Sequence, residues 1–89
     1  MRRIKFKTQC ERDLKRMKRR GKNSESFLSV AEILAIDGYL VAKYHSHKLS
    51  GEWVGLWECH IESDWLLIYD INDTEVLFVR TGTHSDLFE

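Results

Sequence analysis

The chain has 89 residues, of which 43% are hydrophobic and 31% are charged, and it contains no proline. This length suits one domain, residues 1–89, with a single hydrophobic core, and the composition excludes a disordered chain. No apolar stretch is long enough for a signal peptide or a membrane span, which predicts a cytoplasmic protein with no membrane partner.

The charges are unevenly distributed, although the formal net charge is zero. Residues 1–22 contain eleven Lys and Arg residues against Glu11 and Asp13, a net charge of +9, and residues 23–89 carry the balancing −9. Two interpretations are open, a solvated basic surface or a surface that binds a polyanion. The concentration of positive charge on one element favours nucleic acid.

The N-terminal segment predicts a short strand followed by a basic helix. Ile4 and Phe6 alternate with lysines, which is the period of a half-buried strand. Residues 8–11, Thr-Gln-Cys-Glu, fit a capping box, and apolar residues then recur at helical spacing until Gly21. We therefore expect an amphipathic helix over residues 8–20 with a basic outer face.

A second helix is predicted from Asn23 or Ser24, either of which can cap it, to a stop at Asp37 and Gly38. Its apolar positions follow Phe27 at i+3, i+4 and i+7. Because only a few residues join the two helices, we expect an antiparallel hairpin that packs its apolar stripes on a sheet.

The rest of the chain predicts a loop and three strands. Residues 39–51 show no sustained period and are predicted as a long surface loop. Strand-like segments follow at residues 53–61, 65–71 and 75–81, separated by short turn-forming links. With the N-terminal strand at one edge, the predicted fold is α+β, in the order β-α-α-β-β-β. The helical hairpin would cover one face of a four-stranded, mainly antiparallel sheet.

Five titratable side chains gather around the predicted meander: His47, His60, Asp64, Arg80 and His84. Each alone has a structural explanation, such as a turn residue or an exposed loop residue. Together, two histidines could serve as base and acid, a carboxylate could orient one of them, and an arginine could stabilise a pentacovalent phosphate. This set fits metal-free RNA cleavage by attack of the 2′-hydroxyl, with no cofactor.

The aromatic and cysteine residues have structural interpretations too. Phe88 either packs over the sheet edge or stacks on a splayed base. The three tryptophans are expected to fill the core or its rim, with base stacking as the alternative for Trp65. Cys10 and Cys59 are expected to be free, buried thiols, because they lack C-x-x-C spacing.

Two segments, HKLSGEWVGLWECHIESDWLLIYDI (residues 47–71) and RTGTHSDLF (residues 80–88), resemble the YafQ branch of the RelE/ParE superfamily of bacterial toxins. The similarity lies in a loop histidine before L-x-G-x-W, an H-[IV]-x-x-D-W-[LI]-L-I-Y hairpin and an R-T-G-[TS]-H-x-x-L-F ending. The N-terminal half matches in element order and charge. The resemblance implies a RelE-like fold and a ribosome-dependent mRNA endonuclease neutralised by a cognate antitoxin.

The resemblance also implies roles for two groups of residues. In the catalytic group, the histidines and the aspartate share the proton transfers and the arginine stabilises the phosphate. Its members are His47, His60, Asp64, Arg80 and His84. In the RNA-binding group, the basic helix rests on ribosomal RNA. Its members are Phe88, Arg12, Lys15, Arg16, Arg19 and Arg20. The alternative stacking role of Trp65, which follows from its place beside Asp64 and not from the resemblance, would add that residue to the group.

Three positions depart from the pattern of the family. Lys48 and Ser63 stand where many relatives have proline, which is expected to soften two loops without removing chemistry. Trp57 stands where relatives often have arginine. If that arginine touches RNA in the family, this chain lacks one substrate contact.

Two other functions stay open. The first is a non-catalytic binding module of the same fold, either a gyrase-poisoning toxin or a partner in operator DNA binding, although a pure binder has no need of the histidine and aspartate cluster. The second is a metal site formed by His45 and His47 with His60 or His84, which lacks a cysteine at ligand spacing. The expected partners are the cognate antitoxin, mRNA and ribosomal RNA, with operator DNA reached only through the antitoxin complex.

Overall fold

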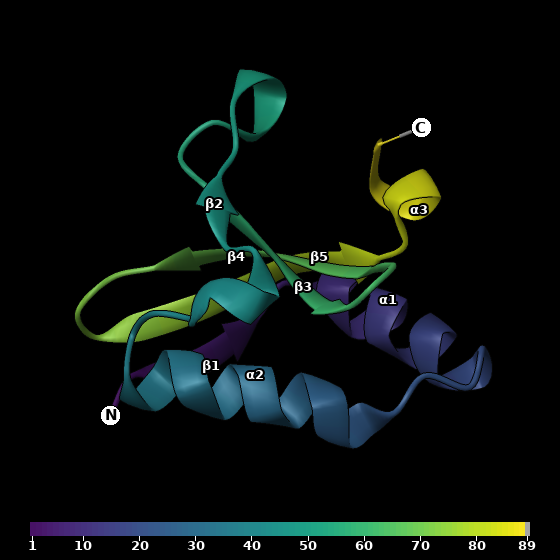
Figure 1. Cartoon of the computed structure of the whole chain (residues 1–89), viewed down its shortest axis with the longest axis horizontal. Helices are drawn as coiled ribbons and strands as arrows, with labels where there is room; N and C mark the ends of the chain where they lie inside the picture. The colour runs from purple at the N-terminus through teal and green to yellow at the C-terminus, as the bar shows by residue number, and fades with distance from the viewer. Residues whose placement is uncertain (89) are drawn as a thin grey trace.

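The computed structural model describes residues 1–88. One sheet, in the order β1-β5-β4-β3-β2, carries α1 and α2 on one face (Figure 1). None of the described helices is long and apolar enough to cross a membrane. The elements are β1 (Arg3–Phe6), α1 (Thr8–Arg19), α2 (Ser24–Ile36), the 3-10 turn η1 (Ala42–Tyr44), β2 (His47–Lys48), the 3-10 turn η2 (Gly51–Trp53), β3 (Trp57–Glu62), β4 (Trp65–Ile71), β5 (Glu75–Gly82) and α3 (His84–Phe88).

The α+β class and the antiparallel meander β3-β4-β5 are confirmed. β1 joins at the edge, parallel to β5, with Arg3 opposite Glu75. The prediction of four strands is wrong by one, because His47–Lys48 pairs with β3 as β2. This strand lies inside the predicted loop 39–51, where two residues are too few to show a period.

β3 begins later than predicted. Residues 53–61 were expected to form one strand, but Trp53 belongs to η2 and the strand starts at Trp57. Gly55 has a φ of 90°, in the left-handed region that glycine enters without strain. The Leu56 N–H donates to the Trp53 carbonyl at 3.1 Å. The chain therefore turns around Gly55, and Trp53 leaves the sheet.

The helix starts show one confirmation and one correction. Asn23 caps α2, since its side chain accepts a hydrogen bond from the Glu25 N–H at 2.9 Å. The capping box predicted at Thr8 is wrong, because Lys7 takes the cap position without a side-chain bond. The Lys7 N–H still donates to the Phe78 carbonyl at 2.9 Å, so α1 starts directly where pairing to the sheet ends.

The two faces of the sheet carry two apolar clusters. The larger cluster lies between the sheet and the helices, where Phe27 and Trp65 stack with ring centroids 6.2 Å apart. The smaller cluster lies on the opposite face and is built on Leu66, Ile68 and Leu87. We call this second face, turned away from α1 and α2, the open face of the sheet. It is the face on which most of the predicted site residues lie.

Both cysteines are free and buried in the cluster under the helices, which confirms their prediction. Burial raises the pKa of the Cys10 thiol to about 12 and the pKa of the Cys59 thiol to about 12. Because the thiolate is the nucleophilic form, neither cysteine is reactive at neutral pH.

Candidate active site

Four residues form one row across the sheet, each opposite the next on a neighbouring strand: His47, Glu58, Ile68 and Arg80. Directly opposed residues of antiparallel strands project from the same face. Neighbouring strands lie about 4.8 Å apart, so β3 and β5 are roughly 10 Å apart across β4. The row therefore places the histidine and the glutamate on one side of an apolar strip and the arginine on the other.

A second row lies beside the first, with His60 opposite Leu66 and Leu66 opposite Gly82. Leu66 and Ile68, both almost fully buried, thus form an apolar floor along β4. His84 follows Gly82 by two residues, at the start of α3. The histidines of β2 and β3 and the histidine of α3 therefore stand on opposite sides of one floor.

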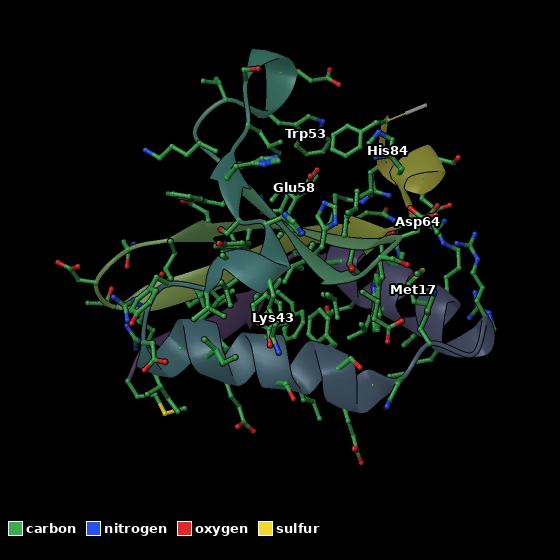
Figure 2. All side chains as sticks on the ribbon, viewed as in Figure 1. Met17, Lys43, Trp53, Glu58, Asp64 and His84 are labelled. Carbon is green, nitrogen blue, oxygen red and sulfur yellow. The ribbon has the colours of Figure 1, made fainter. Side chains whose placement is uncertain are left out.

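Glu58 is a site residue that the sequence reasoning missed. Its side chain is only 7% exposed, and its Oε1 lies 3.4 Å from His47 Nε2 and 4.0 Å from His60 Nε2. Figure 2 shows Glu58 on the side of the sheet away from α2, as are Trp53 and His84. The alternation along β3, which puts residues 58 and 60 on one face, is the sequence signal that points to it. The buried carboxylate therefore lies within ion-pair distance of both imidazoles.

Asp64 holds the start of α3. Its Oδ1 accepts a hydrogen bond from the backbone N–H of His84 at 3.0 Å. The first turn is also closed by Thr83 and Asp86, because the Thr83 N–H donates to Asp86 Oδ2 at 2.9 Å and the Asp86 N–H donates to Thr83 Oγ1 at 3.2 Å. Asp64 was expected beside a histidine side chain, whereas it bonds the histidine backbone. It fixes where His84 stands.

His84 and Phe88 lie one helical turn apart on α3, with ring centroids 5.2 Å apart. His84 is exposed, and Phe88 is half-buried against the cluster of Leu66, Ile68 and Leu87. The sequence left packing and base stacking open for Phe88. The ring does pack, and its accessible part lies beside an imidazole, an arrangement that suits an unstacked base.

Arg80 is paired with a carboxylate from α1. Its Nε donates to Asp13 Oδ2 at 2.7 Å and its Nη2 donates to Asp13 Oδ1 at 3.2 Å. Burial acts to raise the pKa of Asp13, but the hydrogen bonds from Arg80, Gln9 and Thr81 outweigh it and hold that pKa below its usual range. The pair is therefore ionised at neutral pH, and the guanidinium has a fixed direction.

The five basic residues predicted to bind RNA, on α1 and at its C-terminal end, divide into two groups. Arg20 forms a bidentate pair with Asp86 of α3, at 2.6 and 3.2 Å, and Arg16 Nη2 lies 3.4 Å from Asp13 and 3.9 Å from Asp86. Both arginines link the end of α1 to Asp86 of α3, and the Arg20 side chain is still 43% exposed. The other group lies on the exposed surface of α1. It consists of Arg12, Lys15 and Arg19.

Trp65 is not available for base stacking, which corrects that prediction. The side chain is 1% exposed, and its Nε1–H donates to Thr81 Oγ1 at 2.8 Å. The Thr81 hydroxyl in turn donates to the Leu66 carbonyl at 2.6 Å. Asp64, the preceding residue, is exposed, but alternation along β4 turns Trp65 toward the helices. The interpretation of Trp65 as a core residue is confirmed.

His45 lies beside the site without completing a metal centre. It adopts a left-handed backbone with a φ of 51°, and its ring centroid is 5.3 Å from that of His60. Within residues 1–88, no group of three or more His, Cys, Asp or Glu side chains is placed to hold a metal ion. The alternative metal site at His45 and His47 therefore has no ligand set in this arrangement.

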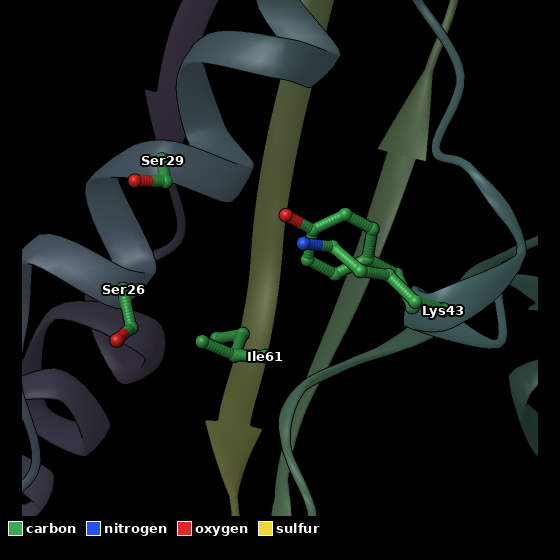
Figure 3. Close-up of a pocket in the computed structure, with 5 residues that line it drawn as sticks. Ser26, Ser29, Lys43 and Ile61 are labelled. Carbon is green, nitrogen blue, oxygen red and sulfur yellow. The ribbon is translucent and has the colours of Figure 1, made fainter.

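A separate cavity of about 310 Å³ lies on the helix side of the sheet (Figure 3). None of the predicted site residues lines it, so it lies apart from the candidate site on the open face. The lining residues are Ser26 and Ser29 of α2, Lys43 and Tyr44 of η1, and Ile61 of β3.

Acid is expected to weaken the attachment of α3 to α1. The hydrogen bonds from Arg20, followed by those from Thr83, hold the pKa of Asp86 well below its usual range. Because this folded-state pKa lies below the unfolded value of about 3.9, the stabilisation is complete above that value and is lost as the pH falls toward the folded pKa. Calorimetry from neutral pH to about pH 2 should show the melting temperature falling below about pH 4.

Asp86→Asn should lower the melting temperature at neutral pH and reduce its acid dependence, because the unfolded-state proton uptake at this site disappears. Asp73→Asn, at an exposed turn position, is the matched control and should leave the dependence unchanged. An acid dependence that is equally steep in Asp86→Asn and in the wild type would show that this ion pair does not stabilise the fold.

The chain is similar along nearly its whole length to bacterial toxins. A family model described as "Bacterial toxin of type II toxin-antitoxin system, YafQ" matches residues 2–89. The mRNA interferase toxin YafQ of Escherichia coli strain K12 is 36% identical over 86 residues, which cover 96% of this chain and 94% of that protein.

Two solved structures show the same likeness in three dimensions. The E. coli DinJ-YafQ toxin-antitoxin complex matches with a TM-score of 0.90 and 36% identity, over 99% of this chain and 98% of that chain. A metal-bound toxin from Helicobacter pylori matches with a TM-score of 0.89 and 33% identity, over 99% of this chain and 100% of that chain.

Proposed function

Because the chain belongs to the YafQ family of bacterial type II toxin-antitoxin toxins, we propose that it is an mRNA interferase, an endoribonuclease that cuts mRNA on the translating ribosome. The observation that carries the proposal is the arrangement of ionisable side chains around the apolar floor. His47, Glu58 and His60 lie on one side of it, and Arg80 and His84 lie on the other. The separation of roughly 10 Å between β3 and β5 leaves room for a phosphodiester between the two sides.

The proposed reaction needs only proton transfers and charge stabilisation. A base takes the proton of a ribose 2′-hydroxyl, and the 2′-oxygen forms a bond to the adjacent phosphorus. The bond from phosphorus to the 5′-oxygen breaks, and an acid gives a proton to that oxygen. The products are a 2′,3′-cyclic phosphate and a 5′-hydroxyl. No step of this reaction is assigned to a metal or another cofactor.

The proton transfers are divided between the residues on the two sides of the apolar floor. The buried Glu58 carboxylate supports the imidazoles of His47 and His60, because a neighbouring negative charge stabilises an imidazolium as it forms. His84, at the start of α3, exchanges a proton at the other end of the phosphodiester. Arg80 keeps its charge at every working pH and stabilises the phosphate oxygens as negative charge develops.

RNA binding is proposed to use the exposed groups around this site. The accessible part of Phe88, beside His84, supports contact with an mRNA base. The exposed basic group of α1, Arg12, Lys15 and Arg19, supports contact with ribosomal RNA phosphates. Arg16 and Arg20 contribute indirectly, since their pairing with Asp86 holds α3 against α1.

The proposed protein partner is a cognate antitoxin. The similarity to the toxin in the E. coli DinJ-YafQ complex supports it. We expect an inhibitory segment that is acidic enough to bind the basic surface of α1 or that displaces His84, because either contact blocks RNA. Operator DNA is proposed to be reached only through this complex, and no contact with a membrane is proposed.

Cleavage of mRNA in purified translating ribosomes, with chelator present and the cut ends mapped, tests the function. The wild type is expected to cut mRNA on ribosomes and to leave the same mRNA intact when it is free. Glu58→Gln is expected to lower the cleavage rate by a factor of about a hundred, since the amide cannot stabilise an imidazolium. Glu32→Gln, an equal change at an exposed position of α2, should keep the wild-type rate.

Three results would count against this proposal. A folded wild type that leaves mRNA intact on ribosomes would refute the activity and direct attention to gyrase and operator DNA. Equal cleavage of free and translated mRNA would refute the dependence on the ribosome. Cleavage that stops when chelator is added would refute the metal-free chemistry.

A further inference from the structure

Asp13 is a buried carboxylate on the apolar side of α1, and it is fully hydrogen-bonded. The residue is 1% exposed. Its Oδ2 accepts from Arg80 Nε at 2.7 Å and from the Thr81 backbone N–H at 3.2 Å, and its Oδ1 accepts from Arg80 Nη2 at 3.2 Å and from Gln9 Nε2 at 3.1 Å. A buried charge is costly unless it is paired and hydrogen-bonded, and Asp13 is both.

Strand pairing explains why a carboxylate lies at this place. β1 ends opposite Phe78, whereas β5 continues to Gly82, so the last part of β5 has no strand on that side. The N–H of Thr81, which an adjacent strand would otherwise bind, donates to Asp13 instead. The side chain thus takes over from β1 at the edge of β5.

The same carboxylate fixes the direction of Arg80. Ile68 pairs with Arg80 while Tyr69 pairs with Phe78, so β5 carries an extra residue at Val79, and such a bulge redirects the neighbouring side chains. Two of the three guanidinium nitrogens of Arg80 bond Asp13. The third, Nη1, makes no hydrogen bond within residues 1–88, and the side chain is 25% exposed.

The charged groups around the Asp13–Arg80 pair carry a net positive charge, which favours the binding of an anion. Three guanidiniums, those of Arg16, Arg20 and Arg80, lie within ion-pair distance of two carboxylates, those of Asp13 and Asp86. The cluster therefore has a net charge of +1. The carboxylates hold the arginines in place without cancelling their attraction for a phosphate.

We propose that Asp13 is a positioning residue, which holds Arg80 so that its Nη1 edge meets the phosphate of the RNA that is cut. This inference rests on the proposed function. It adds that cleavage requires the guanidinium of Arg80 to have a fixed orientation as well as a positive charge. Without the carboxylate, Arg80 keeps its charge but has to be ordered again with each substrate. The loss is therefore expected in kcat more than in KM.

Asp13→Asn tests the proposal, because it keeps the shape of the side chain while one oxygen becomes an NH2 group that accepts no hydrogen bond. On ribosomes, kcat should fall by about tenfold or more with KM within about twofold. In an Arg80→Ala background the same change should cause no further loss, since Asp13 acts through Arg80. Glu11→Gln removes an exposed charge from the same helix and should keep the wild-type kcat.

Several outcomes overturn the proposal. An equal loss from Asp13→Asn in the presence and absence of Arg80 would mean that the residue acts by another route. A wild-type kcat in Arg80→Ala would show that the reaction does not need Arg80, so that Asp13 would have no group to position. The proposed function would still stand, because the wild type cuts mRNA. If Asp13→Asn does not fold, Arg80→Lys decides, because lysine keeps the charge and lacks the fork. A wild-type kcat for Arg80→Lys would show that cleavage does not depend on the orientation of a guanidinium.

An NMR measurement separates this proposal from the proposed function. The Arg80 Nε–H proton is expected to exchange with water about tenfold or more slowly in the wild type than in folded Asp13→Asn, because in the variant the charge-assisted bond to a carboxylate is replaced at most by a weaker bond to a neutral amide oxygen. Equal exchange in the two proteins would overturn the positioning role. If the wild type cuts no mRNA, the proposed function fails first, and the exchange rates still decide whether Asp13 holds Arg80.

Discussion

Replacing His84 with alanine is expected to lower mRNA cleavage on translating ribosomes by a factor of about a hundred or more, which is the usual size of a lost acid or base. The fold should persist, because Asp64 bonds the backbone N–H of residue 84, which alanine retains. Alanine is also the better helix former. Single-turnover cleavage together with a thermal melt measures both effects.

Ser85→Ala is the matched control for this substitution, since residue 85 is exposed on the same short helix. It should cut mRNA at the wild-type rate. A folded His84→Ala protein with undiminished cleavage would show that α3 supplies no proton-transfer group. The proton transfers would then have to be made by His47 and His60 alone.

Replacing Trp65 with alanine is expected to lower the free energy of unfolding by about 3–5 kcal/mol, the usual cost of removing a large buried aromatic side chain. The side chain is almost completely buried, contacts Phe27 and hydrogen-bonds Thr81. Alanine would leave a cavity, and the Thr81 hydroxyl would lose the indole donor while it keeps its own bond to the Leu66 carbonyl. Urea denaturation followed by circular dichroism gives the free energy of unfolding.

Trp65→Phe separates the structural role of this residue from any role in RNA binding. Phenylalanine keeps an aromatic ring but loses the Nε1–H donor, which should cost about 1 kcal/mol of stability. Cleavage per folded molecule should stay at the wild-type rate. A variant of unchanged stability that cuts poorly would mean that the indole contacts RNA, against the burial described above.

The regular parts of the fold are the parts that the sequence predicts well. β4 runs from Trp65 to Ile71 as expected, and Asn23 caps α2 because an amide before an apolar helix pattern favours that role. β2 has only two residues, and the turn at Gly55 delays the start of β3 to Trp57, so neither feature has a period that the sequence could reveal. Periodicity predicts long elements and fails for short ones.

The candidate site is predictable in its chemistry but not in its contacts. Histidines and an arginine near strand ends indicate proton transfer and phosphate binding through the chemistry of their side chains. The pairs Asp13–Arg80 and Arg20–Asp86, however, join residues from the two ends of the chain, and only the packing of α1 along β5 brings them together. No local pattern carries that information. The roles expected of Arg16 and Arg20 as RNA ligands stay predictions, and their pairing with Asp86 adds a structural role.

The parallel pairing of β1 with β5 has a consequence for synthesis of the protein. β5 lies between β1 and β4 and is the last strand of the sheet, so a nascent chain that has just completed β4 has an unattached β1 and only part of the sheet. Closing such a long loop is costly until the contacts that reward it can form. The same last segment carries Arg80 and His84. A growing chain therefore holds neither a finished sheet nor the side chains of Arg80 and His84 until β5 and α3 have been made.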